Sequence, residues 1–289
     1  MGRVRKLGGG AYRRAFVAWV EVEPDPDQLS NAYVCLIPHW DAPASGTESI
    51  QTEARLMRAL EPLDLPFRVP RLLADTPMEG SVALVETHEE GTPLHELKSR
   101  GAILPWEITG HMAAGVHAIT DPAALASVSG FETRRQHAEQ SATIFHEQEE
   151  PLFKEIQAWV HEHLPPATPS VLLHGDLMGQ NILVDTWEDE LPAIIDWSLA
   201  QLGDPAYDLA IVTRGVRRPF KKADGLARLL DAYAEAGGQP LSAAEVRLHE
   251  LCMLASWYRA SQEEECSGQR EHGLGLLRGL FRRVQGSSA

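Results

Sequence analysis

The chain has 289 residues, 44% of them hydrophobic, and a formal net charge of −15. This length can bury a substantial core, whereas the excess of acidic residues argues against a nucleic-acid partner, because displacing counterions from phosphates requires Lys and Arg. The sequence has no apolar run long enough to cross a bilayer and no apolar secretion signal at its N-terminus, so we expect a cytoplasmic protein without a membrane partner.

The first predicted elements are two strands around a glycine-rich turn, between residues 2 and 22. The turn contains Gly8, Gly9 and Gly10. Residues that lack a Cβ let backbone N–H groups approach the phosphates of a nucleotide closely. A run of glycines is by itself more typical of an ordinary hairpin turn, so its interpretation depends on motifs elsewhere in the chain.

The next elements change from strands to helices along the chain. We predict a strand over residues 32–38, a helix that begins near Ser49, and a strand over residues 81–86. The pattern then becomes mostly helical: residues 105–120 place their apolar side chains on one helix face, and residues 134–164 form a more polar helical segment. The sequence therefore predicts a small sheet region followed by a larger helical region.

Two motifs follow the first helical region. They are VLLHGDLMGQNILVD, over residues 171–185, and AIIDWSLAQLGDPAYDLA, over residues 193–210. In each motif a short apolar run leads to a carboxylate, Asp176 in the first and Asp196 in the second, and Asn181 lies five residues after Asp176. A phosphoryl-transfer site needs such parts: an Asp beside the attacking hydroxyl, and hard oxygen ligands that hold Mg²⁺ against the nucleotide phosphates.

These motifs resemble those of the aminoglycoside phosphotransferase family, a group of small-molecule kinases related to choline kinase within the protein-kinase-like fold. The HGD pattern with a later Asn is present as His174, Gly175, Asp176 and Asn181, and the IDW and GDPxxDLA patterns lie within residues 195–210. Two ordered motifs at this separation are more specific than either alone. The simpler alternative is two tight turns whose Asp and Asn side chains cap helices.

The resemblance implies an α+β, bilobal, protein-kinase-like fold. Residues 1–87 are expected to form a small N-terminal lobe with an antiparallel sheet, one helix and the glycine-rich loop. Residues 88–289 are expected to form a larger, mostly helical C-terminal lobe with the catalytic loop, the metal site and the acceptor-substrate region. Either a monomer or a homodimer is compatible with this arrangement.

The resemblance also implies roles for individual residues. Asp176 orients the substrate hydroxyl and accepts its proton as the general base. Asn181 and Asp196 bind Mg²⁺, an ion that hard oxygen donors suit. His174 braces the catalytic loop, and Asp208 hydrogen-bonds to that loop and keeps its shape.

The nucleotide, ATP or GTP, is expected to bind at three places, two in the N-terminal lobe and one at the hinge between the lobes. The glycine-rich turn approaches the phosphates. Glu53, on the predicted helix, pairs with a strand cation that holds those phosphates. The main chain at Glu86 and His88 pairs with the adenine edge, in the segment that resembles the hinge between the lobes.

The chain departs from the family on the strand over residues 32–38. Kinases of this fold carry a Lys or Arg there, which clamps the phosphates, but Leu36 stands at that position and no Lys or Arg occurs between residues 15 and 54. Three explanations are open: a cation from elsewhere, a site that transfers phosphate slowly, or a pseudokinase that keeps the fold for binding. We favour residual or rerouted catalysis, because the base and the metal ligands are all present. The nearest candidates for a replacement cation are Arg13, Arg14 and His39.

The C-terminal region predicts at least three more helices, between residues 225 and 284. In the family this region helps to build the acceptor pocket. Trp257 and Tyr258, with the acidic run that begins at Glu263, are candidates for contacts with a sugar face and its ammonium groups. Core-packed aromatic residues and a solvated acidic helix end are the more common alternative.

The sequence therefore predicts a Mg²⁺-dependent phosphotransferase that moves the γ-phosphate of ATP or GTP to a hydroxyl of a small molecule. The first-choice acceptor is an aminoglycoside or similar amino-sugar antibiotic, so the protein would confer antibiotic resistance, and an acidic chain is compatible with a cationic acceptor. Another small acceptor, such as a macrolide, a hydroxy amino acid or an amino alcohol, is an alternative. A pseudokinase that binds a nucleotide or metabolite is the other alternative, and Leu36 favours it.

Overall fold

A computed structural model of the chain shows two units, each described here by itself. The first unit comprises residues 1–98, 120–129 and 174–200, and the second comprises residues 99–119, 130–173 and 201–289. The lobe boundary predicted after residue 87 stays a prediction. The residues that the structure describes are 3–9, 13–19, 32–39, 43–78, 81–97, 105–146, 150–184, 191–214, 224–263 and 267–286.

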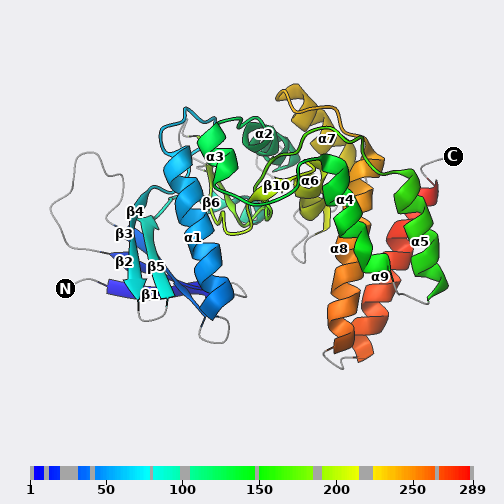
Figure 1. The fold of residues 1–289 in the computed structure, drawn as a ribbon, viewed down its shortest axis with the longest axis horizontal. Coiled ribbons are helices and arrows are strands. Elements are labelled where there is room, and N and C mark those ends of the chain that lie inside the picture. The colour runs from blue at the N-terminus through cyan, green and yellow to red at the C-terminus, as the bar shows by residue number, and fades with distance from the viewer. Residues whose placement is uncertain are drawn as a thin grey trace. The chain divides into compact units, whose positions relative to one another are not determined.

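The first unit is built on a five-stranded antiparallel sheet with the strand order β1-β2-β3-β5-β4 (Figure 1). Across its centre, Ala15 of β2 is opposite Leu36 of β3, which is opposite Leu84 of β5. Residues directly opposite one another project from the same face of a sheet. The sheet and the helices below confirm the predicted α+β class. The strands are β1 (Arg3–Gly9), β2 (Arg13–Trp19), β3 (Ala32–Pro38), β4 (Leu72–Met78) and β5 (Ser81–Thr87).

Helix α1 (Pro43–Leu60) packs against β3 and β5 on this face, as Figure 1 shows. Ile50, Ala54 and Met57 lie along one stripe of the helix and bury together with Leu36 and Leu84. Leu36 is thus a core residue, with 5% of its surface exposed. The helix begins at Pro43 and not near Ser49 as predicted, because its first turns carry small and polar residues that give no apolar periodicity.

The first unit also contains the hairpin that follows the HGD motif. Its strands β8 (Ile182–Val184) and β9 (Ala193–Ile194) pair antiparallel, with Ile182 opposite Ile194, and β6 (Thr92–Pro93) lies on the other side of β8. Arg68 holds β9 through its main chain: its N–H donates to the Pro192 carbonyl at 2.8 Å and its carbonyl accepts from Ile194 at 2.9 Å. This hairpin places the two sequence motifs side by side. The unit's remaining short helices are η1 (Leu94–Glu96) and α3 (Pro122–Ala126).

The second unit is mainly helical and has its own hydrophobic core. Helices α4, α5, α8 and α9 bury Phe145, Phe153, Ile156, Leu251 and Phe281 together, and α8 and α9 run side by side in Figure 1. None of the helices in the described ranges is long and apolar enough to cross a membrane. The predicted C-terminal helices are confirmed as α7, α8 and α9. The elements of this unit are α2 (Pro105–His117), α4 (Arg134–Ala142), η2 (Thr143–Phe145), α5 (Pro151–Glu162), β7 (Val171–Leu173), β10 (Gln201–Gly203), α6 (Ala206–Arg214), α7 (Gly225–Glu235), α8 (Ala243–Glu263) and α9 (Ser267–Gly286).

Candidate active site

The HGD motif forms a tight loop directly after β7. Gly175 has a φ of +82°, and a Cβ added there would collide with the carbonyl oxygen of Leu199. Only glycine allows both this left-handed backbone conformation and this close approach. The glycine between His174 and Asp176 is therefore required by the shape of the loop.

His174 is fully buried and braces this loop with both ring nitrogens. Its Nδ1 lies 3.2 Å from the N–H of Asp176, and its Nε2 lies 3.1 Å from the carbonyl oxygen of Ile195. An amide N–H can only donate and a carbonyl can only accept, so Nδ1 is the acceptor and Nε2 carries the proton. The neutral ring thus ties the Asp176 loop to the segment that precedes Asp196.

Asn181 connects the predicted base to the second motif. Its Nδ2 donates to the main-chain oxygen of Asp176 at 2.8 Å and to the carboxylate Oδ2 of Asp176 at 2.9 Å. The main-chain oxygen of Asn181 in turn accepts the N–H of Ile195 at 3.0 Å. The structure therefore brings Asp176, Asn181 and the residue before Asp196 together. Because Nδ2 is used in both side-chain bonds, Oδ1 is the atom of Asn181 that suits a metal.

Asp196 has an unusual backbone conformation, with a φ of +67°. Asp is one of the few residues other than glycine that adopts this region, at a cost that functional sites often bear. Its Oδ1 accepts the Ser198 hydroxyl at 2.7 Å and also pairs with Arg13. Burial by itself raises the pKa of Asp196, but Arg13 and then Ser198 outweigh it, so the pKa lies below its ordinary value. The side chain is therefore a carboxylate at neutral pH.

Arg13, at the start of β2, is the cation of this site. One of its terminal nitrogens, Nη1, donates to Oε2 of Glu53, and the other, Nη2, donates to Asp196. The other oxygen of Glu53 accepts the N–H of Trp197 at 2.9 Å. Burial lowers the pKa of Arg13, but Glu53 and Asp196 together raise it above its ordinary value. Helix α1, strand β2 and the Asp196 loop are thus joined through one guanidinium group.

Glu86 adds a third carboxyl group to this environment. It lies on β5, is 6% exposed, and its Oε2 has no hydrogen-bond partner within the part of the chain that the structure describes. Burial, followed by the charge of Glu53, raises the pKa of Glu86 well above its ordinary value of 4.5. The N–H of His88 donates to the Ala32 carbonyl at 3.2 Å. The pairing of the Glu86 and His88 main chains with adenine stays a prediction, and it requires that the His88 bond opens.

The glycine-rich turn is described only in part. Gly8 and Gly9 close β1, where the pairing with β2 shifts between Lys6 and Gly9. Gly10 lies outside the described residues. Because Arg13 opens β2 three residues later, the site's cation directly follows this turn.

Asp208 belongs to the second unit, on α6. Its Oδ2 lies 3.2 Å from Nε2 of His117 on α2, and Nδ1 of the same histidine lies 3.0 Å from the hydroxyl of Tyr233 on α7. All of these side chains are buried. This network fixes the Asp208 carboxylate relative to α2 and α7, while its role in bracing the catalytic loop stays a prediction.

The acceptor candidates on α8 differ in exposure. Trp257 is 40% exposed, whereas Tyr258 is 4% exposed and packs on Phe153 with ring centroids 5.5 Å apart. Glu263 ends α8, and its side chain lies outside the described part. Of the two aromatic candidates, Trp257 is therefore the one that a ligand can reach, and Tyr258 is part of the helical core.

Two residues of this site, Asn181 and Asp196, could hold Mg²⁺. Within the described ranges, no group of three or more His, Cys, Asp and Glu side chains is arranged to hold a metal. Asn181 and Asp196 offer one amide oxygen and one carboxylate, which suits Mg²⁺ because this ion usually takes one or two carboxylates and completes its shell with phosphates and water. The sequence did not predict the bond from Ser198 or the choice of Arg13 among the candidate cations.

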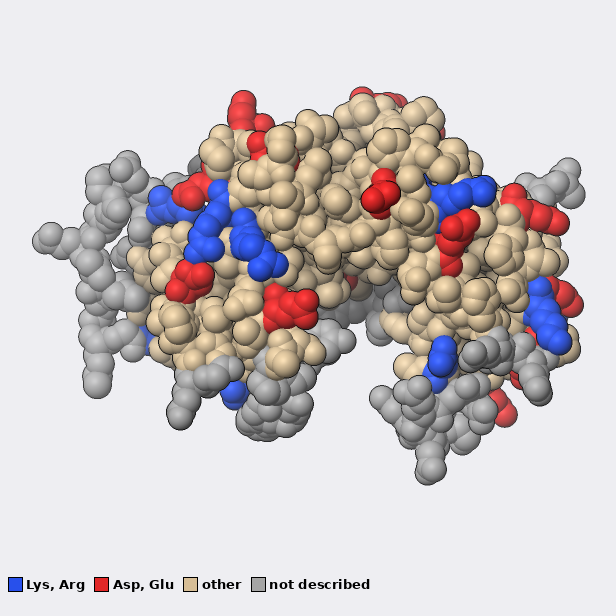
Figure 2. Space-filling model, in the orientation of Figure 1, with Lys and Arg blue, Asp and Glu red and all other residues tan. Residues whose placement is uncertain are grey.

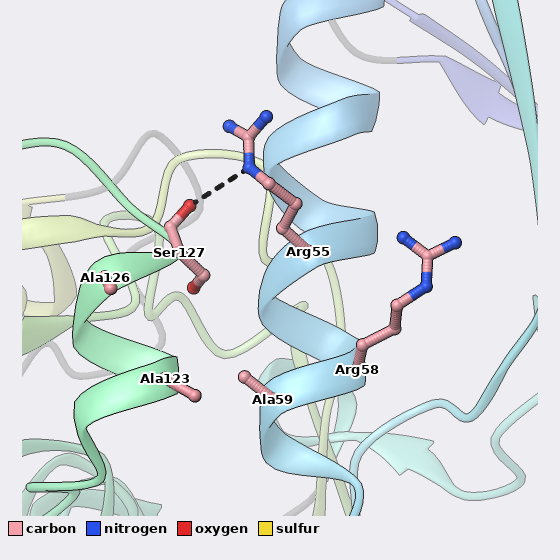
Figure 3. A pocket seen from close by; sticks show the side chains of 6 residues that line it. All are labelled: Arg55, Arg58, Ala59, Ala123, Ala126 and Ser127. Atoms are coloured by element: carbon pink, nitrogen blue, oxygen red, sulfur yellow. Dashed lines mark hydrogen bonds between the residues drawn. The ribbon is translucent and has the colours of Figure 1, made fainter.

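A separate pocket of about 390 Å³ lies between α1 and α3 (Figure 3). Arg55 reaches across it, and its Nε lies 3.4 Å from the Ser127 carbonyl. Arg58 pairs with Asp75 at 2.6 Å, and Figure 2 likewise shows Lys and Arg beside Asp and Glu on the face that it draws. The predicted site residues do not line this pocket. Its lining is Arg55, Arg58, Ala59, Ala123, Ala126 and Ser127.

Comparison with known proteins gives a match over most of the chain. The family APH, described as "Phosphotransferase enzyme family", matches residues 22–264. Among curated proteins, acyl-CoA dehydrogenase family member 10 of Mus musculus is 31% identical over 78 residues, which are 27% of this chain and 7% of that protein. The chain thus spans only a small part of the length of this curated relative.

Two solved structures show the fold. The GDP and kanamycin complex of APH(2″)-IIIa has a TM-score of 0.70 at 14% identity, with 97% of this chain and 93% of that chain covered. Macrolide 2′-phosphotransferase type I has a TM-score of 0.65 at 21% identity, with 95% and 90% covered. These likenesses confirm the predicted protein-kinase-like fold.

Proposed function

The chain belongs to the phosphotransferase enzyme family, and on that premise we propose that it transfers the γ-phosphate of a nucleoside triphosphate to a hydroxyl group of a small molecule. One observation carries this proposal: Asn181 binds the carboxylate of Asp176 at 2.9 Å while its main chain accepts the N–H of Ile195, next to Asp196. Two tight turns that merely cap helices would not need this convergence.

Asp176 acts as the general base in this proposal. Its carboxylate accepts the proton of the acceptor hydroxyl, whose oxygen forms a bond to the γ-phosphorus. The bond from that phosphorus to the β–γ bridging oxygen breaks, and the nucleoside diphosphate leaves with the electron pair. Asn181 orients Asp176 through Nδ2, and His174 holds the main-chain N–H of Asp176 in place.

Asn181 and Asp196 are the residues that would hold Mg²⁺. When bound, this ion neutralises charge on the phosphate oxygens as the leaving group departs. The left-handed backbone at Asp196 and the Ser198 bond aim the carboxylate. Gly8 and Gly9, at the end of β1, would approach the phosphates together with Gly10, which lies outside the described residues.

Solved structures of similar fold and the charge of the chain support a choice of nucleotide and acceptor. One solved structure with this fold is a GDP complex and another is an ADP complex, which supports ATP or GTP as the donor. The first of these also contains kanamycin, and the net charge of −15 favours a cationic acceptor. We therefore place aminoglycosides first among the acceptors, and macrolides next because of the second solved structure.

The test is to incubate the purified protein with Mg²⁺, ATP or GTP, and a panel of aminoglycosides, macrolides and amino alcohols. Mass spectrometry should show one acceptor that gains a single phosphoryl group, with one nucleoside diphosphate formed for each. The same assay with excess chelator should show no product. Nucleotide binding without product across the panel would support the pseudokinase and contradict this proposal.

A further inference from the structure

Arg13 lies in the candidate active site and pairs with one of its proposed metal ligands. The residue is 7% exposed, and its guanidinium group lies between two carboxylates, Glu53 and Asp196. An arginine fork presents several N–H donors in a fixed plane, a shape that matches carboxylate and phosphate oxygens. One of its two partners, Asp196, is the residue that the proposed reaction assigns to the metal.

The register of the sheet explains how a cation on β2 can take the place of the missing cation on β3. Arg13 is opposite Pro38 and Ala15 is opposite Leu36, so Arg13 and Leu36 are diagonal neighbours on the face that α1 covers. Diagonal neighbours lie roughly 7–8 Å apart, within reach of a long side chain. Between them, Ala15 of β2 packs against the cluster that contains Leu36. Arg13 can therefore place its charge where a cation at position 36 would place its own.

The charges around Arg13 are unbalanced. Glu53, Asp196 and Glu86 all lie close enough to affect its pKa, and Oε2 of Glu86 has no hydrogen-bond partner within the described residues. Among the described residues, Arg13 thus lies near three buried or half-buried carboxyl groups. Removal of one carboxylate from Arg13 would leave it still paired with Glu53 and close to Glu86.

We propose that Arg13 is the phosphate-binding cation of this site, supplied from β2 in place of a cation on β3. It would exchange its bond to Asp196 for one to a phosphate oxygen of the nucleotide, which would leave Asp196 free to hold Mg²⁺, and it would keep its bond to Glu53. This inference rests on the proposed function and deepens it. It also excludes Arg14 and His39 from this role.

The experiment compares nucleotide and nucleoside binding, so it does not depend on turnover. Calorimetry with Mg²⁺ and ATP or GTP, and separately with adenosine or guanosine, is carried out on the wild type and on Arg13→Met. The variant should bind the triphosphate roughly 10- to 100-fold more weakly, the range for a lost hydrogen bond to a charged group. Nucleoside binding should stay within about twofold, because only the phosphates contact Arg13.

Two further variants separate this role from a structural one. Arg14→Met is the matched control, because Arg14 projects from the opposite face of β2, and it should bind the triphosphate as the wild type does. Arg13→Met with Leu36→Lys returns a cation to β3 and should recover most of the triphosphate affinity. If Arg13→Met alone does not fold, Arg13→Met with Glu53→Gln removes the unpaired buried charge and keeps an acceptor for the Trp197 N–H.

The outcomes distinguish the two proposals. Equal weakening of triphosphate and nucleoside binding in Arg13→Met, or no weakening at all, would overturn the role of Arg13 while the proposed function stands. If the wild type binds neither ATP nor GTP, the proposed function fails, and this inference fails with it.

Discussion

Asn181 holds Asp176 at two points, since its single amide nitrogen donates to the main-chain oxygen at 2.8 Å and to the carboxylate at 2.9 Å. This pairing fixes the side-chain torsions of the predicted base relative to its own backbone. A base whose carboxylate is already oriented loses less conformational freedom when the substrate binds. The same amide leaves its oxygen for the metal, so one residue couples the base to the proposed metal site.

Substitution of the base should separate chemistry from binding. Asp176→Asn keeps the size and the hydrogen-bonding capacity of the side chain but removes its basicity, so phosphoryl transfer should fall by at least about 10²- to 10⁴-fold. Nucleotide affinity, measured by calorimetry, should change little because in the proposed reaction Asp176 contacts the acceptor hydroxyl and not the nucleotide. Asp64→Asn, at an exposed position, is the control and should keep full activity. Retained transfer in Asp176→Asn would remove Asp176 from the base role.

The glycine of the HGD motif offers a test of loop geometry. Gly175→Ala suffers both a positive φ and a collision with the Leu199 carbonyl, whereas Gly237→Ala, at φ +87°, has open space around the added Cβ. Gly237→Ala should lower the free energy of unfolding by about 1–2 kcal/mol. Gly175→Ala should cost a further 1–3 kcal/mol, roughly, for overpacking. Denaturant titration measures both, and equal losses would contradict the requirement for close approach.

Breaking the buried ion pairs of Arg134 should lower the free energy of unfolding more than breaking an exposed ion pair does. Arg134 donates through Nε to Asp204 at 2.8 Å and through Nη2 to Glu245 at 2.6 Å. Arg134→Met leaves the buried Asp204 without this partner and should cost about 3–5 kcal/mol. Arg228→Met breaks an exposed pair with Asp224 and should cost less than about 1 kcal/mol. A loss in Arg134→Met as small as that of the control would show that the network is dispensable.

The sequence predicted those parts of the site that depend on local order. His174, Asp176 and Asn181 lie within eight residues, so one loop and the first strand of the hairpin suffice to bring them together. Asp196 follows the second strand of the same hairpin, so it comes directly after Ile195, whose N–H donates to the main-chain oxygen of Asn181.

The partner of Glu53 could not be predicted in this way. Arg13 is 40 residues from Glu53 and 183 from Asp196 along the chain. Its pairing depends on the register between β2 and β3 and on the position of α1 across the sheet, which no local pattern specifies. The sequence therefore showed that position 36 lacks a cation and left three candidate residues to replace it. The contacts of Arg13 with Glu53 and Asp196 in the structure favour Arg13 among them.

Acid should destabilise the protein partly through His137. Its Nδ1 accepts the N–H of Asp204 at 3.0 Å, and burial, followed by the charge of His249, lowers its pKa from the ordinary 6.5 to about 3. The unfolded chain thus binds a proton near pH 6.5 that the folded chain binds only near pH 3. The free energy of unfolding should therefore decrease as the pH falls through this window, by up to about 1.4 kcal/mol per pH unit from this residue.

Two substitutions isolate this contribution. His137→Asn keeps an acceptor for the Asp204 N–H but does not titrate, so its free energy of unfolding should fall less steeply than that of the wild type between pH 6.5 and about 3. His137→Phe should show the same shallower slope but a lower value at every pH, because the Asp204 N–H then loses its buried partner, at about 1–3 kcal/mol. Denaturant titrations at a series of pH values measure both quantities. A slope in His137→Asn equal to that of the wild type would mean that other groups, and not His137, take up the protons on unfolding.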